Sequence, residues 1–124
     1  MRLYALLAVA GAFGAMARYA VTVFMAHQFG RQYPWGTLTV NVVGSALIGF
    51  LGIFLLTKLQ ISTEYRIAIL TGFLGAFTTM STFSIDSLTL FERHEWWVSG
   101  MYITVTIMAC LAAARGGMLL AERL

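Results

Sequence analysis

The chain has 124 residues, of which 60% are hydrophobic and 10% charged, and its formal net charge is +3. A soluble domain carries about a quarter charged residues, so this composition and a mean hydropathy of +0.82 exclude one. We predict an integral, all-α membrane protein in which a single four-span domain accounts for residues 1–124.

Residue types that build most metal and catalytic sites are scarce in this sequence. Cys110 is the only cysteine, which excludes an intrachain disulfide and a thiolate cluster. His27 and His94 lie far apart near the ends of predicted spans, so a side-chain metal site is not expected. No nucleophile–base pair or phosphate-binding loop is visible, and an enzyme is not predicted.

The first predicted helix covers residues 3–29, which exceeds a hydrocarbon core of about 30 Å. Its start resembles a signal peptide, but the apolar pattern resumes after Arg18, so a retained helix is predicted. Two interpretations of Arg18 stay open. Its side chain either snorkels to the nearer interface or places a cation at the mouth of an anion pathway.

The second predicted helix covers residues 36–58 and follows a turn at Pro34. Thr37 would cap its start. Asn41 lies about one turn into the helix and also has two interpretations. It either makes an interhelical hydrogen bond, or its amide solvates an anion without bringing charge.

The third predicted helix, residues 65–91, contains the least helix-like stretch of the chain, GAFTTMSTF at residues 75–83. Glycine and hydroxyl-bearing residues weaken a helix. A backbone that opens at membrane depth must bury its carbonyls in protein, or use them on an ion or a water-filled cavity. We therefore predict a functional break at mid-membrane. Asp86, about one turn beyond Thr82, is the only acid in any span.

The fourth predicted helix covers residues 96–120 and follows a short charged loop at residues 92–95, which we interpret as solvated. Tyr102, Thr106 and Cys110 recur every four residues and share one face of this helix. Such a stripe is either a packing surface or a polar path through the membrane.

The basic residues are distributed unequally between the two ends of the spans. Five lie on the side of the termini: Arg2, Lys58, Arg66, Arg115 and Arg123. Only Arg31 and Arg93 lie on the other side. The positive-inside rule thus favours cytoplasmic termini.

Three motifs, in this order and in a chain of this length, resemble the Fluc/CrcB fluoride channel family. They are GAFGA with Arg18-Tyr19, GTL with Val40-Asn41 and Gly44-Ser45, and the stretch of residues 71–84. The resemblance covers nearly the whole chain, and the third motif is the most specific.

The resemblance implies an antiparallel, dual-topology homodimer in the cell inner membrane. Such a channel lets toxic fluoride leave the cytoplasm passively and confers fluoride resistance. It also implies a structural Na⁺ at the dimer centre, held by backbone carbonyls that match Gly75 and Thr78. Hard cations prefer oxygen ligands, which agrees with this assignment.

The resemblance further implies which side chains line the fluoride route. The matching positions are Asn41, Thr79, Met80, Ser81, Thr82, Phe83, Tyr102, Thr106 and Cys110. Arg18 and Asp86 match the vestibule. Phe83 is the second of two family phenylalanines whose positive ring edges face the anion.

This sequence departs from the family pattern at three positions. Met80 replaces the first of the two phenylalanines and offers no positive ring edge. Cys110 stands where a hydroxyl is usual, and its S–H is a weaker donor. Asp86 stands where glutamate is usual.

Three alternatives stay open. In the first, the chain would be one subunit of a two-gene heterodimeric fluoride channel, and the bias in basic residues fits this alternative. A small four-helix exporter of cationic compounds would need a carboxylate deep in the membrane, whereas the first helix carries Arg18 and no acid. A non-transporting membrane assembly factor is opposed only by the ion-suited break.

Overall fold

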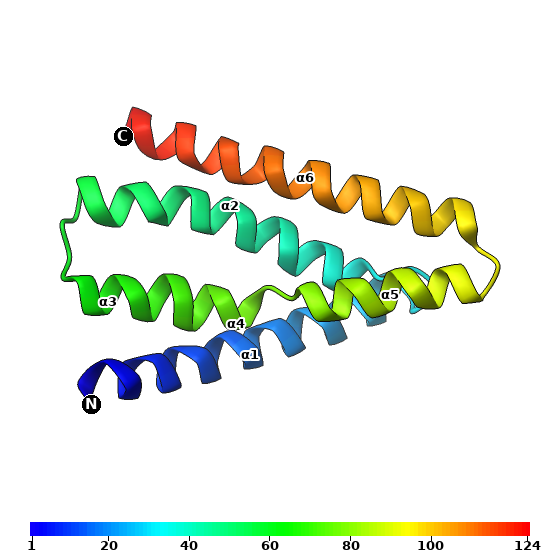
Figure 1. Cartoon of the computed structure of the whole chain (residues 1–124), viewed down its shortest axis with the longest axis horizontal. Coiled ribbons are helices and arrows are strands. Elements are labelled where there is room, and N and C mark those ends of the chain that lie inside the picture. Colours follow the sequence, from blue (N-terminus) through cyan, green and yellow to red (C-terminus); the bar gives the residue numbers. More distant parts are fainter.

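The computed structural model describes residues 1–124, and every regular element in it is helical. Four helical segments are long and apolar enough to cross a membrane: α1 (Arg2–Phe29), α2 (Trp35–Thr57), a composite third span (Thr63–Glu92) and α6 (Trp96–Arg123). The predicted all-α, four-span architecture is confirmed. Both termini and the α2–α3 connection lie at one end of the molecule (Figure 1).

The third span is composed of several pieces. They are α3 (Thr63–Ile67), the π-helix η1 (Ala68–Leu74), α4 (Gly75–Phe77) and α5 (Met80–Glu92). Between α4 and α5, Thr78 and Thr79 are extended, with φ/ψ of −84°/159° and −152°/112°. The gap in the helical ribbon is visible partway along the molecule (Figure 1). The sequence did not predict the π-helix, which widens the turn just before the interruption.

Glycines allow the helices to approach closely where they cross. A Cβ atom on Gly117 of α6 would collide with the backbone carbonyl of Ala46 in α2. A Cβ atom on Gly49 of α2 would collide with the carbonyl of Ala114 in the same way. Backbone-to-backbone approach of this kind supplies packing energy between membrane helices, where the hydrophobic effect is weak. The α2–α6 pair is the most extensive helix contact in the chain.

The start of α2 differs from the prediction. The helix begins at Trp35 after Pro34, whose backbone φ of −79° is set by its ring. Thr37 is buried within the first turn and makes no capping hydrogen bond, so the prediction that it caps the helix was wrong.

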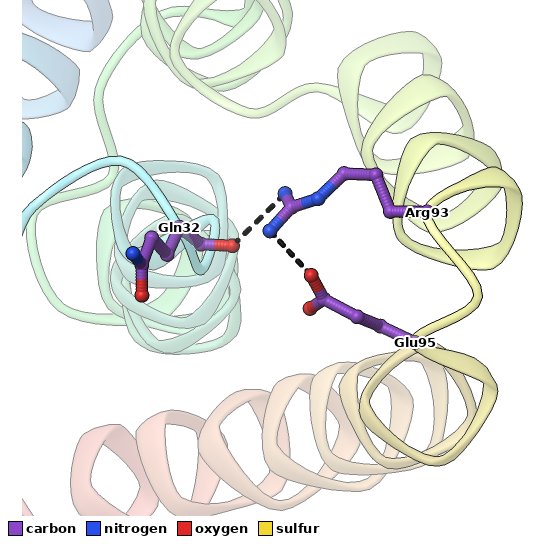
Figure 2. Close-up of polar contacts among 3 residues, drawn as sticks. All are labelled: Gln32, Arg93 and Glu95. Atoms are coloured by element: carbon purple, nitrogen blue, oxygen red, sulfur yellow. Dashed lines mark hydrogen bonds and ion pairs between the residues drawn. The ribbon is translucent and has the colours of Figure 1, made fainter.

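The charged loop at residues 92–95 is not merely solvated, because one of its side chains contacts another loop. Arg93 donates a hydrogen bond to the backbone carbonyl of Gln32 at 3.3 Å and pairs with Glu95 (Figure 2). It therefore links the α1–α2 loop to the α5–α6 loop. The sequence placed both loops on the same side of the membrane but did not predict this contact between them.

Gly117→Ala is expected to destabilise the protein, because its Cβ meets backbone that cannot rotate away. Overpacking of this kind costs about 1–3 kcal/mol. Gly116→Ala is the matched control, since nothing lies within 4 Å of a Cβ there and alanine favours the helix. The measurement is the thermal unfolding midpoint of each purified variant in detergent. Equal midpoints for the two variants would contradict the packing described for Gly117.

Candidate functional site

Asn41 of α2 holds the interrupted backbone of the third span. The Thr79 N–H donates to Asn41 Oδ1 at 2.8 Å, and Asn41 Nδ2 donates to the Thr79 carbonyl at 3.1 Å. A backbone donor beside a backbone acceptor fixes the orientation of the amide. Of the two interpretations of Asn41 from the sequence, interhelical hydrogen bonding and anion solvation, the structure contains the first. The second hydrogen on Nδ2 has no partner within the chain.

The hydroxyl of Thr79 caps the start of α5. Its Oγ1 accepts from the Thr82 N–H at 3.2 Å and donates to Thr82 Oγ1 at 3.0 Å. Ser81 Oγ lies 3.4 Å from the same Thr79 oxygen. An N-cap residue satisfies one of the N–H groups that a helix leaves free at its start. The Thr79 hydroxyl is therefore the shared partner of the Ser81 and Thr82 hydroxyls at the helix end.

The Gly75 and Thr78 carbonyls lose their regular partners at the interruption. In a continuous helix the Gly75 carbonyl accepts from the Thr79 N–H, and the Thr78 carbonyl accepts from the Thr82 N–H. Here the first N–H goes to Asn41 and the second to Thr79 Oγ1. The Gly75 and Thr78 carbonyls therefore offer oxygen atoms of the kind that a hard cation prefers.

No group of three or more His, Cys, Asp or Glu side chains is placed to hold a metal ion. Any hard cation near the interruption would depend on backbone carbonyl oxygens or on neutral hydroxyl and amide oxygens. The Gly75 and Thr78 carbonyls fit that requirement, and Gly75 lies on the exposed surface of the chain.

A pocket of about 380 Å³ opens beside the interruption, between α2, α6 and the third span. It brings together most of the residues that the sequence assigned to the site. These are Asn41, Gly75, Thr78, Thr79, Met80, Phe83, Thr106 and Cys110. Gly44 also lines the pocket, and a Cβ atom there would collide with the Thr78 side chain, so α2 approaches the interruption closely.

Thr106 is the one pocket-lining side chain that is buried without a hydrogen-bond partner. It is 5% exposed, and its Oγ1 bonds to no other group in the chain. A buried hydroxyl left unpaired costs about 1–3 kcal/mol, so such groups are rare and invite an explanation. This oxygen is available to a polar species in the pocket.

Tyr102 lies beyond the pocket, between Phe83 and the α1–α2 loop. Its ring centroid is 5.3 Å from that of Phe83 and 5.6 Å, edge-on, from that of Tyr33. Its hydroxyl donates to Asp86 Oδ2 at 3.4 Å. The predicted polar face of α6 is therefore divided, with Tyr102 packed among aromatic rings and Thr106 and Cys110 at the pocket.

A second pocket of about 340 Å³ lies toward the α1–α2 loop. Asp86 and Thr82 line it together with Tyr33, a residue that the sequence analysis missed. Burial raises the pKa of the Tyr33 phenol, which remains a neutral hydrogen-bonding group at neutral pH. Only its place beside Pro34 could have drawn attention to it.

Arg18 and Ser81 line neither pocket described above. Arg18 is partly exposed and forms no ion pair with an acidic side chain. Of the two predicted vestibule residues, Asp86 lines the second pocket, and Arg18 lines neither of the two.

Residues 5–118 match the family model described as CrcB-like protein, Camphor Resistance (CrcB). Three curated relatives, each named fluoride-specific ion channel FluC, are 43% identical to this chain. They come from Methylococcus capsulatus, Agrobacterium fabrum and Rhizobium etli, over 95%, 97% and 91% of the chain. The match covers 96% of the Agrobacterium protein and 90% of the Rhizobium protein. The chain spans about half the length of the Methylococcus relative, at 52%.

Asn41→Ala is expected to destabilise the protein, because the buried Thr79 N–H loses its acceptor. An unsatisfied buried group costs about 1–3 kcal/mol. Ser45→Ala is the matched control: it lies one turn later on α2, lines the same pocket and makes no side-chain hydrogen bond. The measurements are the unfolding midpoint and amide hydrogen exchange at Thr79. Unchanged protection of Thr79 in Asn41→Ala would contradict the role of the amide.

Proposed function

The chain belongs to the CrcB family, and on that basis we propose that it is a fluoride-selective channel rather than an enzyme. It lets cytoplasmic F⁻ leave passively, down its electrochemical gradient, and so lowers intracellular fluoride and confers resistance. The observation that carries this proposal is the pocket at the interruption, where Asn41, Phe83 and the unpaired Thr106 hydroxyl meet. The relatives' shared name supplies the identity of the ion.

Neutral groups in the pocket would replace part of the hydration shell of F⁻. Thr106 supplies a hydroxyl, Asn41 supplies an unused amide hydrogen, and Phe83 supplies a ring whose edge is positive. The pocket also lies at the N-terminal end of α5, where the helix dipole favours an anion. Such contacts bind an anion weakly enough for it to leave again, which conduction requires.

The distribution of charge supports passive transport. Asp86 is the only acid away from the ends of the spans, and it lines the other pocket, hydrogen-bonded to Tyr102. The pocket of Asn41 and Thr106 is lined by no carboxylate that would exchange a proton for F⁻. Fluoride enters cells as the neutral acid and is trapped as the anion, which a negative-inside membrane potential drives out.

The exporter and assembly-factor alternatives receive no support from the relatives, which are named ion channels. The cation exporter is further opposed by α1, which carries Arg18 and contains no Asp or Glu. The protein is a multi-pass membrane protein, and in bacteria channels of this family lie in the inner membrane.

The functional unit in this proposal is an antiparallel homodimer with a structural Na⁺ between the two chains. The support is that the Gly75 and Thr78 carbonyls lack their helical partners and that Gly75 is exposed. Bound Na⁺ would neutralise and tie together the carbonyls of the two interrupted spans. A heterodimer with a paralogue is the second candidate, which the five-to-two bias in basic residues favours.

The deciding experiment is fluoride efflux from liposomes that contain the purified protein alone, followed with a fluoride electrode. We expect F⁻ to leave and Cl⁻ to be retained. Phe83→Ile is expected to lower the flux by about tenfold or more, a barrier change of about 1.4 kcal/mol. Phe91→Ile is the matched control, because Phe91 lies on the same helix but outside the pocket.

Chloride efflux as fast as fluoride efflux would overturn the proposed selectivity. Unchanged flux in Phe83→Ile would remove that ring from the route.

Sodium dependence tests the dimer and its ion. For the protein purified without any partner, the unfolding midpoint is expected to rise with Na⁺ at constant ionic strength, with N-methylglucamine as the replacement cation. Each tenfold increase above the Kd adds about 1.4 kcal/mol. A midpoint independent of Na⁺ would contradict the cation site, and a purified chain that remains monomeric and inactive would favour the heterodimer.

A further inference from the structure

Two sulfur-containing side chains line the pocket at the interruption, and the proposed function uses neither. Met80 is the first residue of α5 and is 73% exposed, and Cys110 lies on α6 as a free thiol. Both line the same cavity of about 380 Å³ although they are distant in sequence. A thioether and a thiol thus reach one space from two different helices.

The same pocket contains an independent sign that it holds a polar species. Thr106 lies one turn before Cys110 on α6, is 5% exposed and has an unpaired hydroxyl oxygen. A group of this kind can bond to a water or anion that accompanies a bound ion. The cavity therefore combines two soft ligand atoms with a free hydroxyl.

We infer that this pocket binds a soft monovalent cation of the Ag⁺ or Cu⁺ class, with Cys110 Sγ and Met80 Sδ as ligands. Thiolate and thioether sulfurs select such ions, whereas Na⁺ and Mg²⁺ prefer oxygen. On binding, the S–H bond of Cys110 breaks, a sulfur–metal bond forms and the proton passes to water. No oxidation state changes.

Charge explains why the ion would be monovalent. A thiolate and a monovalent cation form a neutral pair, which a largely apolar pocket tolerates better than a net charge. The N-terminal end of α5, where Met80 lies, stabilises the thiolate and disfavours any excess positive charge. A divalent ion would leave such an excess.

Occupation of this site has a consequence that rests on the proposed function. If F⁻ passes through this pocket, a cation held by Met80 and Cys110 obstructs its route. The protein would then be a fluoride channel that thiophilic ions block.

The test begins with direct binding of Ag⁺ to the purified full-length protein in chloride-free detergent buffer, measured by titration calorimetry. We expect one Ag⁺ per chain, with binding abolished in Cys110→Ser. Met80→Leu keeps the apolar bulk but removes the thioether, and is expected to weaken binding by about tenfold or more. Met108→Leu is the matched control, since Met108 lies exposed on α6, two residues before Cys110, and outside the pocket.

An affinity in Met80→Leu equal to that in Met108→Leu would overturn the two-sulfur site. Undiminished binding in Cys110→Ser would do the same. Should Cys110→Ser fail to fold, the comparison of Met80→Leu with Met108→Leu still decides the matter.

A second measurement separates this site from the proposed function. Fluoride efflux from liposomes is followed with and without Ag⁺, whose fluoride salt is soluble, and each variant is compared with its own rate. Ag⁺ is expected to stop efflux in the unaltered chain and in Met108→Leu, but not in Cys110→Ser. Binding at Cys110 and Met80 without any effect on efflux would support the soft-cation site and overturn the assignment of this pocket as the fluoride route.

Discussion

The centre of this protein depends on the pair of hydrogen bonds between the Asn41 side chain and the backbone of Thr79. An interrupted helix inside a membrane leaves N–H and C=O groups that lipid cannot satisfy. The Asn41 amide supplies one acceptor and one donor at the extended residue, without introducing charge. Because it takes the Thr79 N–H, it also releases the Gly75 carbonyl from its helical partner. Gly44 makes this possible, since any larger residue there would push α2 away from Thr78.

One interruption creates two ends of opposite polarity. The end of α4 presents carbonyls, which carry partial negative charge, and the start of α5 presents N–H groups, which carry partial positive charge. A cation and an anion can therefore be accommodated close together without any charged side chain. The exposed Gly75 belongs to the first end, and Met80, at the edge of the pocket, belongs to the second. This division explains how a short stretch of the chain can support both a structural ion and a transported one.

The sequence predicted the parts of this structure that depend on local composition. Four apolar runs specify four spans, and glycine with threonine and serine in residues 75–83 weakens the third helix at the point where Thr78 and Thr79 are extended. What depends on tertiary contacts was not predictable. Nothing local to Arg93 indicates that Gln32 is its partner, and nothing local to Asn41 selects the Thr79 backbone. The π-helix before the interruption contains Thr71 and Gly72, which weaken an α-helix, but nothing in its residues specifies a π-helix rather than an α-helix.

Because Met80 and Cys110 line the pocket, its other groups must supply most of the hydrogen bonds to an anion. Neither sulfur supplies a strong donor, so the dehydration of an anion there depends on Thr106, the free amide hydrogen of Asn41 and the Phe83 ring. The Thr106 hydroxyl has no partner in the chain, and neither has the second Nδ2 hydrogen of Asn41. An arriving anion therefore gains a hydrogen bond at Thr106 without breaking one within the protein. That gain favours dehydration in the absence of a cationic side chain, and it is small enough that the ion is released again.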